Sequence, residues 1–88
     1  MTPPTVITPD TMVNGRACDQ FCASLRETVE SGVRVIVVDC RSVRYMNSRS
    51  IGALLEAYME VSNRDGSIRL VAPDRVLRRG LEVVGLLS

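Results

Sequence analysis

The chain has 88 residues, a formal net charge of +1 and no histidine. This length predicts one small domain, and a charge near zero argues against the strongly basic surface that nucleic acid or a membrane attracts. Hydrophobic residues make up 45% of the chain and aromatic residues 3%, so we expect a folded domain with an aliphatic core. Residues 1–4 are the exception and are expected to be disordered.

No segment has the features of a targeting signal or a membrane span. The N-terminus lacks a basic region followed by an apolar run, and no stretch approaches about 18 consecutive apolar residues. We therefore expect a cytoplasmic protein. Its three cysteines, Cys18, Cys22 and Cys40, fit that compartment as reduced, mostly buried thiols. No metal or cofactor is expected, because a cysteine site would need a further ligand and histidine is absent.

The first half of the chain predicts a strand, a helix and a second strand. A short strand is expected over residues 5–8, ended by Pro9, with a loop over 10–15. Apolar residues every four positions predict a helix over 16–31, which Gly32 ends as a left-handed cap. The members of this apolar stripe are Ala17, Phe21, Leu25 and Val29, widened by Cys18 and Cys22.

Nearly continuous valine and isoleucine predict a strand over residues 33–38 that is buried on both faces, as in a parallel sheet covered by helices. A loop over 39–44 follows, and then a helix over 48–63. The predicted inner stripe of that helix is Ile51, Leu54, Leu55, Tyr58 and Met59, and its predicted outer residues are Glu56, Glu60 and Asn63. Gly52 weakens a helix interior by about 1 kcal/mol, which suggests that it packs closely against the sheet.

The end of the chain predicts a third strand and a third helix. Asp65-Gly66 forms a turn, residues 67–71 form the strand, and Pro73-Asp74 begins the last helix. The inward residues of that helix are expected to be Val76, Leu77, Leu81 and Val84. The fold class is therefore α/β, a βαβαβα domain with a mainly parallel sheet and helices packed on it.

The most informative segment is the junction between the second strand and the second helix. Asn47 and Ser48 suit a helix start, and either could cap the helix. The N-terminus of a helix presents unpaired N–H groups and about half a positive elementary charge, which favours an anion. Arg49 and Ser50 occupy the first turn, and the next acid is Glu56, so the helix itself does not neutralise that charge.

Residues 35–39 and 45–55, Val-Ile-Val-Val-Asp and Tyr-Met-Asn-Ser-Arg-Ser-Ile-Gly-Ala-Leu-Leu, resemble the signature of STAS domains, best known as bacterial anti-sigma factor antagonists. Residues 66–73 and 76–86 are similar to the third strand and following helix of the family, so the resemblance extends over about 6–86. Family members commonly have a further strand before this region and a strand and helix after it. The chain is therefore expected to be truncated at both ends relative to the family.

The resemblance implies a regulatory protein-binding module that acts in transcription by partner switching. Ser48 matches the serine that a cognate serine kinase, itself the anti-sigma factor, phosphorylates in such members of the family. The unphosphorylated protein would bind this kinase through the helix start and the adjoining loop, and phosphorylation would break the contact. The expected partner-binding residues are Arg44, Met46, Asn47, Ser48, Arg49, Ser50 and Ile51.

Two residues depart from the family pattern. Asn47 stands where the family usually has aspartate, which removes a negative charge beside a future phosphate but could slow recognition by the kinase. Ser50 stands where the family usually has glycine, and it is expected to add a side chain where a partner approaches closely.

Alternatives remain open beside this hypothesis. The domain could be a constitutive, non-phosphorylated STAS subunit of a transport or signalling complex, or a small nucleotide-binding or sensory domain, although no glycine-rich phosphate loop supports the latter. No catalytic set is found, so no enzyme is predicted. Arg41, Arg44 and Arg49 could form a docking patch for an acidic partner or could be ordinary solvated charges. Exposed sheet edges also suggest a homodimer.

Overall fold

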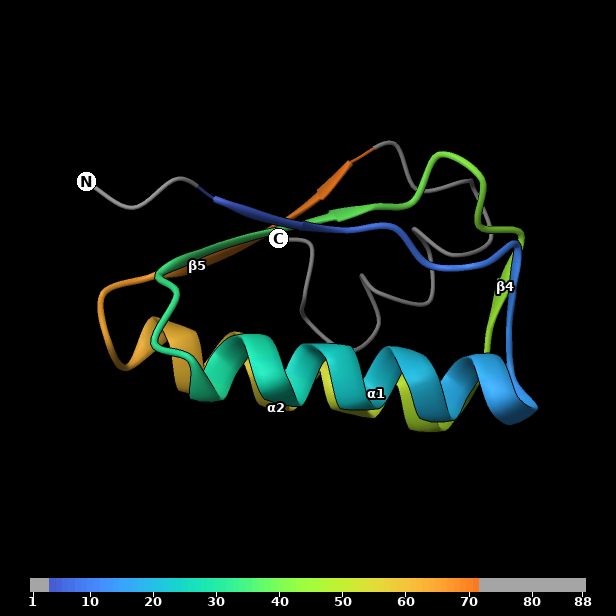
Figure 1. Cartoon of the computed structure of the whole chain (residues 1–88), viewed down its shortest axis with the longest axis horizontal. Coiled ribbons are helices and arrows are strands. Elements are labelled where there is room, and N and C mark those ends of the chain that lie inside the picture. The colour runs from blue at the N-terminus through green and yellow to red at the C-terminus, as the bar shows by residue number, and fades with distance from the viewer. Residues whose placement is uncertain (1–3, 72–88) are drawn as a thin grey trace.

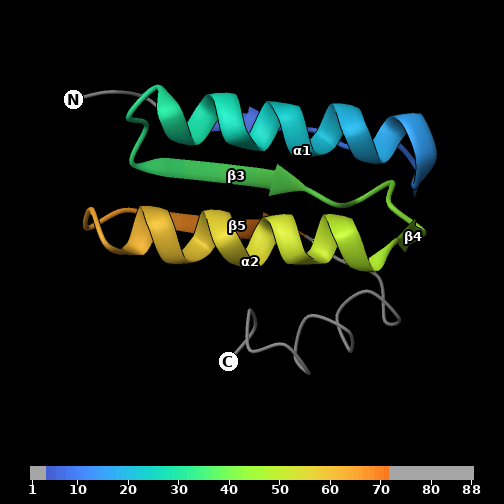
Figure 2. The ribbon, with the colours of Figure 1, turned by 90° about the horizontal axis from the view of Figure 1, so that it is seen from below.

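In the computed structural model of the chain, the described residues are 4–71. The strands β1 (Thr5–Ile7), β3 (Val35–Asp39) and β5 (Ser67–Val71) form a parallel sheet in the order β1-β3-β5. The helices α1 (Gly15–Glu30) and α2 (Ser48–Ser62) lie side by side on one face of this sheet (Figure 1). Viewed from the helix side, the two helices run in the same direction (Figure 2).

A second, two-stranded ladder lies at the end of the molecule where both helices begin. The strands β2 (Met12–Val13) and β4 (Tyr45–Met46) pair in parallel. The carbonyl oxygen of Val13 accepts a hydrogen bond from the Asn47 N–H at 3.1 Å, which ties this ladder to the start of α2. The sequence predicted only a loop over 10–15, since two residues are too few to show an alternating pattern.

The predicted α/β class and parallel sheet are confirmed, with β3 at the centre of the three strands. The prediction that β3 is buried on both faces is wrong. Ile36 and Val38 are fully buried, whereas Val35 and Val37 are only partly buried. Strands added in one direction through right-handed crossovers place their connecting helices on the same face of a sheet. Both helices therefore cover the Ile36 side. The predicted last helix lies outside the described residues.

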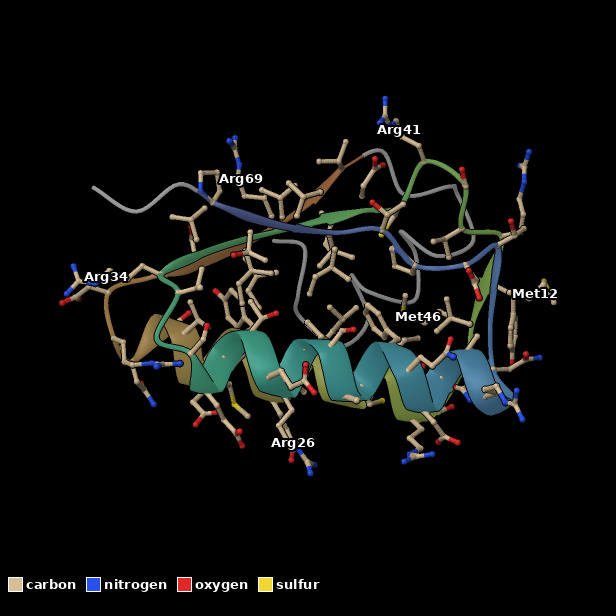
Figure 3. All side chains as sticks on the ribbon, in the orientation of Figure 1. Met12, Arg26, Arg34, Arg41, Met46 and Arg69 are labelled. Atoms are coloured by element: carbon tan, nitrogen blue, oxygen red, sulfur yellow. The ribbon has the colours of Figure 1, made fainter. Side chains whose placement is uncertain are left out.

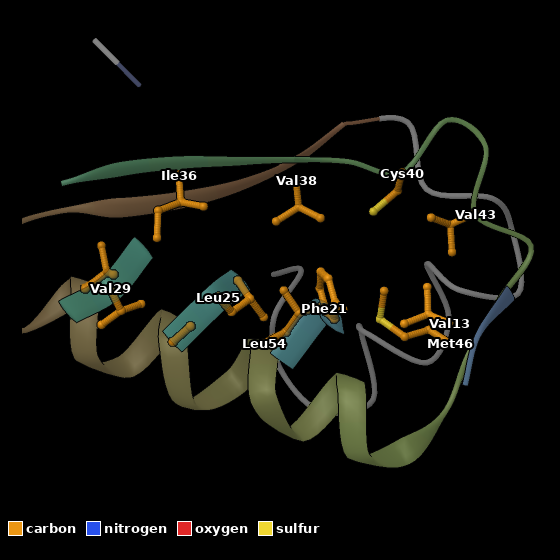
Figure 4. Close-up of a cluster of buried hydrophobic side chains, with 12 residues drawn as sticks. Val13, Phe21, Leu25, Val29, Ile36, Val38, Cys40, Val43, Met46 and Leu54 are labelled. Carbon is orange, nitrogen blue, oxygen red and sulfur yellow. The ribbon is translucent and has the colours of Figure 1, made fainter. Parts of the chain in front are cut away.

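The hydrophobic core fills the space between β3 and the two helices (Figure 4). It is aliphatic apart from Phe21 and the sulfur-containing side chains, as the composition predicted. Four positions of α1 face this core: Cys18, Phe21, Leu25 and Val29. The helix ends as predicted, since Gly32 has a φ of 85° and its N–H bonds to the Val29 oxygen at 3.1 Å.

The buried face of α2 differs from the predicted stripe. The residues that are buried are Ser50, Leu54, Ala57 and Val61. Tyr58 and Met59 were predicted to be inward, but 39% and 51% of their surfaces are exposed. The helix packs against α1 as well as against the sheet, so its buried arc turns toward Ser50 and Ala57. Gly52 is also exposed and does not pack on the sheet, contrary to the prediction.

The turn between α2 and β5 requires glycine at position 66. A Cβ atom there would lie 2.3 Å from the Arg34 carbonyl oxygen and 2.5 Å from Val61 Cγ1. The first neighbour is backbone and cannot rotate away. We expect Gly66→Ala to lower the free energy of unfolding by about 1–3 kcal/mol, the usual cost of overpacking. Urea denaturation monitored by circular dichroism measures this change.

Gly52→Ala is the matched control for that substitution. No heavy atom lies within 4 Å of a Cβ placed at residue 52. The added methyl group should therefore raise the free energy of unfolding by about 0.5–1 kcal/mol through its better helix propensity. Equal destabilisation by the two substitutions would contradict the described packing of both glycines.

Candidate functional site

The candidate site begins with the cap of α2, which Asn47 provides. Its backbone is extended, its carbonyl accepts the first helical hydrogen bond from the Ile51 N–H at 3.1 Å, and its side-chain Oδ1 accepts one from the Ser50 N–H at 2.9 Å. Of the two caps that the sequence allowed, Asn47 is therefore the one used. The cap satisfies one of the amides that a helix N-terminus leaves unpaired.

Ser48 therefore does not cap the helix. It is the first residue of α2 and is exposed. The N–H groups of Ser48 and Arg49 bond to no acceptor within residues 4–71, and the first turn contains no acid. An exposed hydroxyl thus stands beside two unpaired amides at the positive end of the helix dipole. Such an arrangement can accept an anion or carry a phosphoryl group.

Ser50 does not protrude toward a partner, contrary to the expectation from its departure from the family pattern. Its side chain is fully buried, and its hydroxyl donates a hydrogen bond to Cys18 Sγ at 3.0 Å. This bond joins the start of α2 to α1 and lowers the pKa of the Cys18 thiol. Cys22 Sγ lies 4.0 Å from Cys18 Sγ, and burial raises the pKa of Cys22.

The exposed apolar side chains of the β2–β4 ladder, which leads into α2, belong to residues that the sequence analysis did not select. Met46 is 6% exposed and points into the protein, whereas Met12 points outward at 51% exposure (Figure 3). Tyr45, the register partner of Met12, is 46% exposed. Successive side chains of a strand point to opposite faces. In a strand at 45–46, burial of Met46 therefore directs Tyr45 to the opposite, exposed side. Ile51 is only partly buried.

Two of the three arginines expected around the junction are paired. Arg49 Nη1 contacts Asp19 Oδ1 on α1 at 2.5 Å, and this pair raises the pKa of Arg49. Arg41 binds Asp39 with two of its nitrogens, at 2.9 and 2.7 Å. Arg44 is in no ion pair with residues 4–71. The predicted basic patch is therefore partly neutralised, and Arg44 is its unpaired cation in the described part of the chain.

The Arg41 pair gives a pH-dependent signature at the end of β3. Hydrogen bonds from the Arg41 guanidinium, and then from its backbone N–H, hold the pKa of the Asp39 carboxyl below its usual value. The stabilisation from a lowered carboxyl pKa is present above the unfolded-state pKa and is lost as pH falls through the folded-state pKa. We expect a carbon-detected NMR titration to place Asp39 below ordinary aspartates. Arg41→Gln should raise the pKa of the Asp39 carboxyl back toward that of ordinary aspartates. An unchanged Asp39 titration would contradict the ion pair.

Sequence comparison identifies the class of protein. A family model described as Mlab, STAS domain matches residues 5–87, which is nearly the whole chain. The chain therefore belongs to the STAS domain family. Comparison with the sequences of curated proteins gives no match. Within residues 4–71, neither helix has the length and apolar character that crossing a bilayer requires.

Two solved structures share this fold. The anti-sigma factor antagonist SpoIIAA in its unphosphorylated form superposes with a TM-score of 0.81 at 21% identity, over 94% of this chain and 73% of that one. The Bacillus cell fate determinant SpoIIAA in its phosphorylated form superposes with a TM-score of 0.79 at 23% identity, over 94% of this chain and 76% of the other. The chain thus has the fold of an anti-sigma factor antagonist and spans about three quarters of its length.

Proposed function

We propose that this STAS domain is a regulatory, non-enzymatic anti-sigma factor antagonist of the cytoplasm. It binds a serine kinase that is also the anti-sigma factor, through the start of α2 and the adjoining β2–β4 ladder. Phosphorylation of Ser48 switches this binding off. The observation that supports the proposal is the different environment of two serines. Ser48 is exposed at the helix start, whereas Ser50 is buried and bonded to Cys18.

The surroundings of Ser48 favour a phosphoryl group in the free protein. The N–H groups of residues 48 and 49, which bond to no acceptor within residues 4–71, are donors, and the helix dipole favours negative charge by about 0.3–1 kcal/mol. Arg49 can add a charge-assisted bond, but it must first leave Asp19. Both side chains of that pair are about two-thirds exposed, and exposed pairs contribute little, so a doubly charged phosphate competes well for Arg49.

The same charge would oppose binding to a partner. Tyr45 and Met12 expose apolar surface on the β2–β4 ladder, which leads into α2, and a partner that covers both the ladder and the helix start would remove Ser48 from water. A charge buried without compensation costs several kcal/mol, which exceeds the gain in the free protein. The two effects have opposite signs, so phosphorylation stabilises the free domain and weakens the complex.

Phosphorylation itself is tested by intact mass. Purified protein incubated with ATP and lysate of the source cells should gain the mass of one phosphoryl group, and Ser48→Ala should gain none. Fragmentation should place the group on residue 48. An unmodified wild-type protein that still binds its partner would favour the constitutive STAS subunit instead.

Binding is tested with substitutions at the same position. Ser48→Asp should weaken affinity for the kinase by more than about a hundredfold, equivalent to about 3 kcal/mol, and leave the melting temperature unchanged or slightly higher. Ser48→Ala should bind like wild type. Titration calorimetry with the purified kinase measures all three proteins. Wild-type affinity in Ser48→Asp would show that Ser48 is outside the interface and would reject the switch.

A further inference from the structure

The start of α2 makes two contacts with one turn of α1. The Ser50 hydroxyl donates to Cys18 Sγ at 3.0 Å inside the protein, and Arg49 Nη1 contacts Asp19 Oδ1 at the surface. The buried bond joins the sequence neighbours of both surface residues, so it holds the Asp19 carboxylate within reach of Arg49. The position of this ion pair is therefore a consequence of the packing of α1 against α2.

Asp19 supplies a negative charge that α2 itself lacks. The first turn of α2 contains no acid, and within residues 4–71 Asp19 is the acid that pairs with a residue of that turn. Ser48 directly precedes Arg49, so a phosphoryl group on Ser48 would be a second anion beside the same guanidinium. A carboxylate and a phosphate would then compete for one cation.

We propose that Asp19 is an internal competitor of the Ser48 phosphoryl group for Arg49, and that it limits how firmly the domain holds that group. This role depends on the proposed phosphorylation of Ser48 and concerns its regulation. In the unphosphorylated form, Asp19 holds Arg49 toward α1. In the phosphorylated form, Arg49 divides its time between the two anions, and the doubly charged phosphate takes the larger share.

The exposure of the ion pair suits this role. Both side chains are about two-thirds exposed, and exposed pairs shift an equilibrium by only about 1.5- to fivefold. The pair therefore contributes little to folding, but it is strong enough to change how a nearby phosphate distributes between two states. When Arg49 turns to the phosphate, Asp19 becomes an unpaired carboxylate on α1. Phosphorylation of α2 thus changes the charge that both helices present to a partner.

Phosphorus NMR of the full chain, with phosphoserine incorporated at position 48 during synthesis, tests the competition without a kinase. The second pKa of an unperturbed phosphoserine is about 6, and a nearby guanidinium lowers it by stabilising the doubly charged form. Asp19→Asn frees Arg49 and should lower the phosphate pKa further, by about 0.2–0.5 pH units. Arg49→Gln should raise the phosphate pKa above that of the phosphorylated wild-type chain.

A double-mutant cycle separates competition from direct repulsion, because Asp19→Asn also removes a negative charge near the phosphate. In the Arg49→Gln background, Asp19→Asn should change the phosphate pKa by less than half as much, since the contested cation is gone. Glu27→Gln is the matched control on the exposed surface of α1. It removes the same charge about 12 Å further along the helix, beyond the Debye length in 0.1 M salt, and should leave the phosphate pKa unchanged.

Three results would overturn the proposal. An unchanged or higher phosphate pKa in Asp19→Asn would show that Arg49 serves both anions at once. An equal change with and without Arg49 would leave direct repulsion as the whole effect. A change in Glu27→Gln as large as that in Asp19→Asn would remove the need for a specific pair. Failure of wild-type protein to gain a phosphoryl group from lysate and ATP would instead reject the switch, and it would leave these titrations unaffected.

Discussion

The handedness of the crossovers is the constraint on which this structure depends. Because β1, β3 and β5 are added in one direction, both helices fall on one face and begin at the same end of the molecule. The start of α2, the β2–β4 ladder and the first half of α1 therefore meet there. Cys18 reaches Ser50, and Asp19 reaches Arg49, only because of this arrangement. The contacts that support the start of α2 are therefore a result of this topology.

The Asn47 cap and the buried Ser50 hold the start of α2 through hydrogen bonds within the chain itself. Asn47 holds the backbone of Ser50 through its side chain, and Cys18 accepts the Ser50 hydroxyl. A partner that bound here would not have to order these groups, and preorganisation of this kind preserves affinity that would otherwise be lost in ordering them. The two residues that depart from the usual family pattern are thus part of the scaffold that presents Ser48.

Much of the fold could be predicted from the sequence, because its signals are local. The stripe of α1, the Gly32 cap and the valine-rich β3 depend on residues close together in the chain. Which face of α2 is buried could not be predicted in the same way. Its orientation depends on α1, and the apolar Tyr58 looks as suitable for the core as Ala57 does. The short β2 strand was missed because its two residues are too few to show an alternating pattern.

In the candidate site, too, the features that depend on neighbouring residues could be predicted, and those that depend on another helix could not. Ser48 and its helix terminus followed from the junction pattern, whereas the orientation of Ser50 required knowledge of Cys18 on another helix. Likewise, Arg49 and Asp19 are 30 residues apart in the sequence, so no local pattern predicts their ion pair. Residue chemistry predicted which groups are present, but the packing of the two helices determines which of them remain available to a partner.

At residues 47–50, two exposed residues stand between two that hold the helix start, and this order has a consequence for how such a domain can diversify. Asn47 and Ser50 hold the helix start, so substitution there changes folding free energy. Ser48 and Arg49 are exposed, and the ion pair of Arg49 with Asp19 lies at the surface, so both residues can vary at little cost in stability. A lineage can therefore change the surface that residues 48 and 49 present while the same scaffold continues to fold.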